Sequence, residues 1–122
     1  MKKSLAMSIF EVIGSPLCVA SSDGQKIFDR LSPALKEGHS VVLSFRHVTM
    51  LTSAFLNAAI GQLYGTFSED QIRSLLDVED MQPDDLALLK RVVDTAKLYF
   101  ADPKKFDQVI RDVLEDGDEE KS

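Results

Sequence analysis

The feature that most constrains the fold is a short apolar run, Val41–Phe45, followed by a turn, a hydroxyl pair and an amphipathic segment. The run is rich in β-branched residues and is bounded by Gly38 and polar residues, which predicts a central parallel strand covered on both faces. Thr52 and Ser53 can accept hydrogen bonds from the free N–H groups of a helix's first turn. We therefore expect one of them to cap a helix over Ala54–Tyr64.

This predicted helix has two different faces. One face is apolar and should pack on the sheet; it comprises Leu56, Ala59, Ile60 and Leu63. The other face is small and polar, and together with the cap it forms the candidate partner-binding surface: Thr52, Ser53, Asn57, Gly61 and Tyr64. A glycine inside a helix costs about 1 kcal/mol relative to alanine. Gly61 therefore suggests that another group approaches the helix closely at this point.

The same residues resemble the central strand and following helix of STAS domains, the fold of bacterial anti-sigma-factor antagonists. The resemblance is greatest to STAS-like domains of unknown function, which share an apolar strand, a valine after the turn and a hydroxyl pair followed by phenylalanine. The matching residues are VVLSF, Val48, Thr52-Ser53 and Phe55. Thr52 and Phe55 stand where the antagonists have aspartate and glycine, and Ser44 stands where an aspartate often ends the strand. The close similarity spans about a fifth of the chain, and the element order extends it more loosely over residues 7–100.

The resemblance implies an α/β domain that binds a protein partner and is not an enzyme. In the antagonists a partner kinase phosphorylates the serine that aligns with Ser53, so Ser53 is the candidate phosphorylation site and an ATP-binding, kinase-like protein is the implied partner. A phosphate there would meet the positive end of a helix and block docking. The alternative is that Thr52 or Ser53 only caps the helix.

Length and charge exclude several other classes. A chain of 122 residues with 28% charged residues has room for one domain, which we place at residues 1–114. Glu115–Ser122 holds five acids and one base, so −4 of the net charge of −6 lies in this predicted disordered tail. The chain has no basic cluster, so we expect no nucleic-acid partner. It has no apolar run of about 18 residues, so we expect no membrane association. Its single cysteine fits a cytoplasmic location, which we expect for this protein.

The residues before the central strand predict a hairpin and a helix. Met7–Ile13 alternates like an edge strand, and we expect Leu17–Ala20 to pair with it as a second, antiparallel strand after a Gly-Ser-Pro turn. Ser21 or Ser22 is the expected cap of the next helix, whose inner stripe is Ile27, Leu31 and Leu35. This hairpin, together with the parallel central strand, predicts a small mixed sheet packed by helices.

The second half predicts one more strand and a helical C-terminal extension. Ile72–Val78 fits a helix or a strand, and we favour a strand near Ser74–Val78 because a strand–helix–strand unit needs a parallel partner. Pro83 should begin a helix; its expected buried stripe is Leu86, Leu89, Val93, Ala96 and Phe100. After Asp102-Pro103 a last amphipathic helix is expected, with its apolar face formed by Phe106, Val109, Ile110 and Val113.

No residue pattern predicts catalysis, a metal site or a cofactor. Ser53 lacks a nucleophile elbow, and His39 and His47 flank opposite ends of the central strand, so they cannot both reach it. Cys18 is expected to be a small buried residue. The acids between Asp77 and Asp85 do not have the spacing of an EF-hand loop.

The sequence therefore predicts a non-catalytic regulatory module that docks a partner through the helix starting at Thr52-Ser53. Two alternatives remain open. The domain could sense a nucleotide or another small molecule, as some STAS domains do, or it could be a structural subunit that self-associates through its last helix. The oligomeric state does not follow from the sequence.

Overall fold

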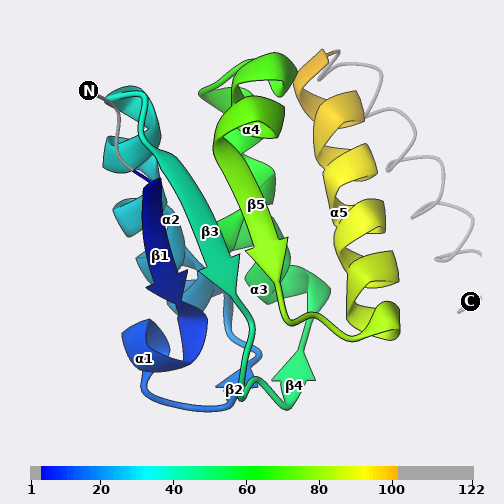
Figure 1. The fold of residues 1–122 in the computed structure, drawn as a ribbon. Coiled ribbons are helices and arrows are strands. Elements are labelled where there is room, and N and C mark those ends of the chain that lie inside the picture. The colour runs from blue at the N-terminus through cyan, green and yellow to red at the C-terminus, as the bar shows by residue number, and fades with distance from the viewer. Residues whose placement is uncertain (1–3, 102–122) are drawn as a thin grey trace, which may run out of the picture.

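The computed structural model describes residues 4–101, which form a small parallel sheet with helices packed against one face (Figure 1). In chain order the elements are β1 (Ser4–Ser8), α1 (Ile9–Ile13), β2 (Leu17–Cys18), α2 (Ser21–Lys36), β3 (Ser40–Ser44), β4 (Met50–Leu51), α3 (Ser53–Ala59), η1 (Gly61–Gly65), α4 (Glu69–Leu75), β5 (Leu76–Glu79) and α5 (Pro83–Ala101). The predicted α/β class is confirmed.

The main sheet has three parallel strands in the order β1-β3-β5, so β3 is central as predicted. Val41 lies opposite Leu5 on one side and opposite Leu76 on the other. β5 supplies the parallel partner expected near Ser74–Val78, although Ser74 and Leu75 belong to α4.

The predicted hairpin is wrong. β2 does not pair with β1; it forms a separate two-stranded parallel ladder with β4, in which Leu17 lies opposite Met50 and Cys18 opposite Leu51. Both sheets are therefore parallel and not mixed. β4 lies in the segment that connects β3 to α3, and its pairing with β2 holds this segment in place.

The first strand is also shorter than expected, because most of Met7–Ile13 is helical. The Ser8 hydroxyl accepts a hydrogen bond from the Glu11 amide at 3.2 Å, and Gly14 closes the helix with a left-handed φ of 77°. These two caps allow a short helix in a segment whose residues were expected to alternate between the two sides of a strand.

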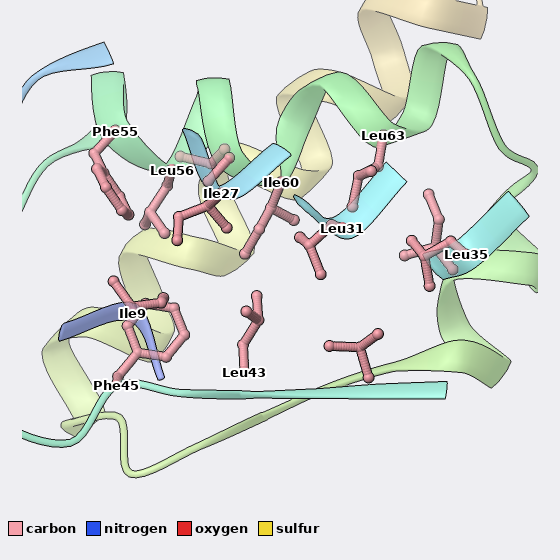
Figure 2. Close-up of a cluster of buried hydrophobic side chains, with 14 of the residues drawn as sticks. Ile9, Ile27, Leu31, Leu35, Leu43, Phe45, Phe55, Leu56, Ile60 and Leu63 are labelled. Carbon is pink, nitrogen blue, oxygen red and sulfur yellow. The ribbon is translucent and has the colours of Figure 1, made fainter. Parts of the chain in front are cut away.

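Only one face of β3 is covered by the core, which corrects the expectation of two covered faces. Val41, Leu43 and Phe45 are at most 3% exposed, whereas Val42 on the opposite face is half-buried. Figure 1 shows α2 and α3 behind the sheet, and Figure 2 shows Leu43 and Phe45 pointing from the β3 segment toward these helices.

The predicted apolar stripes of α2 and α3 form the core (Figure 2). Ile27, Leu31 and Leu35 from α2 meet residues from α3 and η1 above β3. All four residues of the predicted inner face are buried: Leu56, Ala59, Ile60 and Leu63. At about 25 cal/mol per Å² of apolar area, each large side chain contributes about 1.5–3 kcal/mol.

The helix predicted over Ala54–Tyr64 is divided. α3 ends at Ala59, and η1, a tighter helix, begins at Gly61. A tighter helix advances about 120° per residue instead of 100°. The change in pitch accompanies the complete burial of Leu63 and rotates the later residues away from the face that starts at Ser53.

Neither Ser21 nor Ser22 caps α2. The N-cap is Ala20, which makes no side-chain cap hydrogen bond, and both serines are exposed in the first turn. Close packing of α2 on α3 is possible because Gly24 has no side chain: an added Cβ would overlap the Phe55 carbonyl oxygen.

α5 begins at Pro83 as predicted, but its buried residues are Val92 and Ala96. Of the expected stripe only Ala96 is fully buried; Leu86 and Phe100 are 45% and 40% exposed. The helix is rotated relative to the prediction, so that Val92 takes the central position.

The predicted last helix, with Phe106, Val109, Ile110 and Val113, and the acidic tail Glu115–Ser122 lie outside the described residues. The domain boundary at residue 114 stays a prediction for the same reason. None of the helices formed by residues 4–101 combines the length and the apolarity that crossing a bilayer requires.

Candidate functional site

Thr52, and not Ser53, caps α3. Its hydroxyl accepts a hydrogen bond from the Phe55 amide at 3.2 Å and donates one to the Val19 carbonyl at 2.7 Å. The Thr52 amide also donates to the Cys18 carbonyl at 3.2 Å. The side chain therefore holds the start of α3 against the β2 segment, and its hydroxyl proton is already donated within the domain.

Ser53 is left exposed at the first position of the helix. Within residues 4–101 its hydroxyl has no hydrogen-bond partner. Asn57, one turn later, is also exposed. These two predicted site residues lie together on the surface.

Both residues line an open groove of about 610 Å³ between α3 and α5, which we call the α3–α5 groove. The α3 side contributes Ser53, Ala54 and Asn57, and Gln62 follows from η1. The facing wall belongs to α5, and its lining residues are Leu88, Arg91, Val92, Thr95, Ala96, Tyr99 and Phe100. Of these, only Ala96 and Phe100 belong to the stripe predicted for this helix.

A second hollow of about 440 Å³ adjoins the first across α3. Three residues line both, namely Ala54, Asn57 and Gln62; the rest of the second hollow is lined by Ala58 and, from α2, by Ser21, Ser22 and Gln25. The Gln62 amide donates to the Gln25 side chain at 2.7 Å and to the Ala58 carbonyl at 2.8 Å. The first turn of α2 and the exposed side of α3 therefore form one continuous hollowed surface.

Gly61 and Tyr64 do not share this surface. Gly61 is buried, and a Cβ there would lie 2.5 Å from Asn57 Oδ1 and 3.6 Å from Val92 Cγ1. The close approach expected at this glycine is therefore made by the Asn57 side chain of α3, while Val92 of α5 lies at ordinary contact distance. Tyr64 lines a separate cavity of about 250 Å³, together with Glu69 and Lys97 among others, and burial raises the pKa of its phenol.

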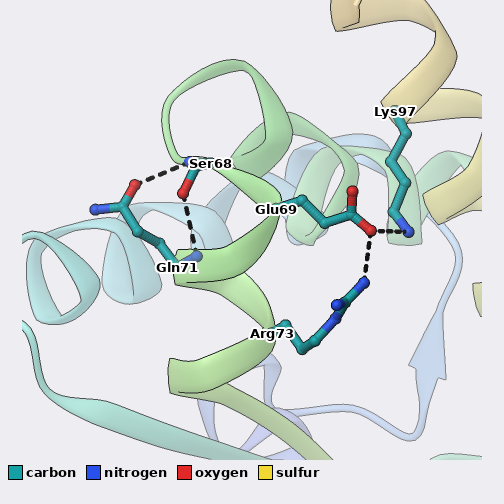
Figure 3. A network of polar contacts seen from close by, with 5 residues as sticks. All are labelled: Ser68, Glu69, Gln71, Arg73 and Lys97. Atoms are coloured by element: carbon teal, nitrogen blue, oxygen red, sulfur yellow. Dashed lines mark hydrogen bonds and ion pairs between the residues drawn. The ribbon is translucent and has the colours of Figure 1, made fainter.

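The α5 wall of the groove is attached to α4 by an ion-pair network (Figure 3). One carboxylate oxygen of Glu69 receives Lys97 Nζ at 2.7 Å and Arg73 Nη2 at 2.8 Å. The hydrogen bond from Lys97, followed by its charge, lowers the pKa of Glu69. Farther along α5, the Phe100 ring lies against Gly65, where a Cβ would come within 2.5 Å of it.

The histidines and the cysteine are apart from the groove. The His47 ring packs edge-on against Phe10 with 5.6 Å between centroids, and His39 Nε2 lies 3.1 Å from a Glu37 oxygen. Cys18 is buried as predicted, and burial raises its pKa to about 11. Among residues 4–101 no three His, Cys, Asp or Glu side chains come together in a way that could hold a metal ion.

A family model described as a STAS-like domain of unknown function (DUF4325) matches residues 23–86, just over half of the chain. The chain belongs to this STAS-like family. The match runs from the first turn of α2 to the first turn of α5, so it includes β3 and both elements on the α3 side of the groove. Comparison with curated proteins and with solved structures found no match.

Membership in the STAS-like family suggests a regulatory or binding module and nothing more specific, and the family is not a known enzyme family. Most of the α5 wall lies beyond the matched residues. The groove in this STAS-like domain therefore joins a family-typical helix to a helix that the match covers only at its start.

Proposed function

We propose that this STAS-like domain is a non-catalytic regulatory module that docks a protein partner in the α3–α5 groove, with Ser53 and Asn57 as contact residues. The observation that carries the proposal is that Thr52, and not Ser53, makes the cap hydrogen bond at the start of α3. Ser53 is therefore not needed to cap the helix, and it lines the groove.

The composition of the groove supports a protein segment as the occupant. Leu88 and Val92 supply apolar area, while Asn57, Gln62 and Arg91 offer polar contacts at its sides. Interfaces commonly combine an apolar centre with a polar rim and an arginine. A partner helix or extended segment could follow α5 along this groove.

Phosphorylation of Ser53 would act as a switch. An ATP-dependent kinase-like partner would transfer the terminal phosphoryl group of ATP to the Ser53 oxygen, adding about −1.5 to −2 charges. The phosphate would lie in the groove that Arg91 also lines. It would fill space that the docked partner needs, so docking would be lost.

The proposal is tested by recovery of partners from the native host with wild type, Ser53→Asp and Asn57→Arg. Ser74→Asp is the matched control, because Ser74 is an exposed serine on α4 outside the groove. We expect a partner recovered by wild type and Ser74→Asp to be lost with the two groove variants. Equal recovery by all four proteins would contradict docking at this surface.

The modification is tested separately by intact-mass measurement and peptide mapping of protein isolated from its host. One phosphate on Ser53 is the expected result. Phosphate found only on other residues would leave docking possible but would remove the switch.

A small-molecule sensor is the second candidate, because the groove volume of about 610 Å³ lies within the roughly 300–1,000 Å³ range of ligand pockets. A thermal-shift screen with nucleotides discriminates between the two. A rise in melting temperature that is lost in Asn57→Arg would favour the sensor.

A further inference from the structure

The strand β5 forms one edge of the main sheet, beside α5 (Figure 1). Among residues 4–101 it pairs only with β3, so its other edge carries no ladder. The Phe45 amide donates to the Glu79 carbonyl at 3.0 Å, which shows that the backbone of Glu79 faces β3. Consecutive strand residues direct their N–H and C=O groups to opposite edges. The N–H and C=O of Val78 therefore point away from β3.

Leu76, two residues earlier, is oriented in the same way as Val78. Its N–H donates to the Ile72 carbonyl at the end of α4, and its C=O is left on the outer edge of the strand. The outer edge therefore presents the N–H and C=O of Val78 and the C=O of Leu76. Backbone groups in this arrangement are a template on which another strand can pair.

A cavity of about 250 Å³, which we call the β5–α5 cavity, lies between this strand and the helix. Leu76 and Val78 line it from β5, and Leu89 and Val93 line it from α5. All four side chains are half-buried. Leu76 and Val78 lie opposite buried residues of β3, so the cavity is on the covered face of the sheet. Apolar side chains of an added strand that point to this face would enter the cavity.

The opposite face of β5 is acidic. Asp77 and Glu79 are exposed there, and within the part of the chain that the structure describes neither forms an ion pair. The cations at the cavity, Arg73 and Lys97, both pair with Glu69. Side chains directly opposite each other on adjacent strands lie about 5 Å apart at their Cβ atoms, and opposite charges there are favourable. Lysine or arginine on an added strand would therefore complement these two acids.

We propose that β5 accepts an extended segment of a partner protein as an additional antiparallel strand, in which apolar residues alternate with lysine or arginine. Antiparallel pairing is slightly more stable per residue than parallel pairing, and it lets one residue make both hydrogen bonds with Val78. That residue and the next but one, opposite Leu76, are apolar and enter the cavity. The basic residue between them lies opposite Asp77.

Two observations separate this edge from other interactions of the domain. The β5–α5 cavity shares no lining residue with the α3–α5 groove, so the inference does not rest on docking in that groove. A second copy of the chain does not fit the edge, because antiparallel pairing about Val78 would place Asp77 of one copy opposite Glu79 of the other. Like charges directly opposite each other destabilise a ladder.

NMR titration of the full chain with the peptide acetyl-Lys-Val-Lys-Val-Lys-amide tests the inference. We expect saturable shifts at the amides of β5, with the Val78 amide proton moving downfield because its N–H gains a hydrogen bond. N-methylation of both valines removes the peptide N–H groups that face β5 and should weaken binding about tenfold. N-methylation of two lysines is the matched control, since those N–H groups face away, and it should leave binding near that of the unmodified peptide. Equal weakening by the two modifications, or no shift at Val78, would overturn the inference.

Variants of the domain test the same edge from the other side. Val78→Pro removes the outward N–H but no hydrogen bond to β3, and should weaken binding severalfold more than Val78→Ala, which keeps the N–H. Circular dichroism checks that both variants fold. The modified peptides need no change in the domain, so they decide the inference even if Val78→Pro is unfolded.

The contribution of charge is tested by Asp77→Lys. Asp29→Lys is its matched control, because Asp29 is exposed on α2 and does not line the cavity. We expect the peptide to bind Asp77→Lys severalfold more weakly and Asp29→Lys about as well as wild type. Equal weakening would show attraction to the net charge of the domain and would overturn the site. Light scattering that detects a dimer of wild type, lost in Val78→Pro, would make a second copy the occupant and would also overturn the proposal.

Discussion

Gly24→Ala tests the contact that positions α2 against α3. Gly24 is buried, and a methyl group there would overlap the backbone carbonyl oxygen of Phe55 and lie 2.9 Å from Ala58 Cβ. Ordinary contact begins near 3.4 Å, so the helices must separate by at least half an ångström at Ala58. A larger shift is needed at the carbonyl, which cannot rotate away.

Overpacking of a buried site costs about 1–3 kcal/mol, and a clash with backbone belongs at the upper end of this range. Alanine returns about 1 kcal/mol through its higher helix propensity. We therefore expect Gly24→Ala to lower the free energy of unfolding by about 2 kcal/mol. Urea denaturation followed by circular dichroism measures this value, with an unchanged slope as the sign of an intact two-state transition.

Gly61→Ala is the matched control, since it makes the same change at another buried glycine. There the nearest atom is Asn57 Oδ1, the end of an exposed side chain that can turn aside. Its effect should stay within about 1 kcal/mol of wild type, because the propensity gain offsets the remaining crowding. Equal stability of the two variants would refute the reasoning about the α2–α3 contact.

Three further outcomes follow from contacts around the site. Thr52→Ala should cost about 1–2 kcal/mol in urea denaturation, because the cap and the bond to the Val19 carbonyl are both lost, while Thr52→Ser should stay near wild type; equal losses would contradict the capping role. With a pKa of about 11, Cys18 should react with an aromatic disulfide reagent at pH 8 only as fast as the protein unfolds, and a rapid reaction in the native state would show that the thiol is accessible. The pKa of Glu69 in the folded protein lies below its ordinary value of 4.5, so its ion pairs should stabilise the protein above that pH and lose this effect as the pH falls through the lowered value. The difference in urea midpoint between wild type and Glu69→Gln should therefore shrink between pH 7 and pH 3. A constant difference would refute the assignment.

The parts of the fold that the sequence predicted well are those with local signals. β3 is an apolar run between breakers, α5 begins at a proline followed by acids, and the α2 stripe repeats every four residues. Each signal acts within a few residues, so tertiary contacts did not need to be known.

The error in the first segment arose from two competing local signals. Residues 7–13 were expected to form a strand with Ile9, Glu11 and Ile13 on one side, but Ser8 and Glu11 have the spacing of a capping box and Gly14 follows as a stop. The caps decided the structure. Weighing them against the alternation would have predicted α1.

Two other features could not be predicted from local patterns. The β2–β4 ladder joins residues more than thirty positions apart, and nothing near Leu17 specifies a parallel partner at Met50. The orientation of α5 was ambiguous, because apolar residues at 86, 88, 89, 92 and 93 fit more than one stripe. The packing of α5 against α3 and η1 decides that Val92 is buried. This orientation places Leu88, Arg91 and Thr95 on the groove.

The ion pair between Lys97 and Glu69 is one of the contacts that attach α5 to the rest of the domain. Of the nineteen residues of α5 only Val92 and Ala96 are fully buried, and the pair with Glu69 lies at the surface, so little free energy opposes detachment of this helix. α3, by contrast, holds Phe55 and Leu56 in the core. The backbone amides of α5 should therefore exchange with deuterium earlier than those of α3. The α5 side of the α3–α5 groove is then the mobile side, and the α3 side is the rigid one.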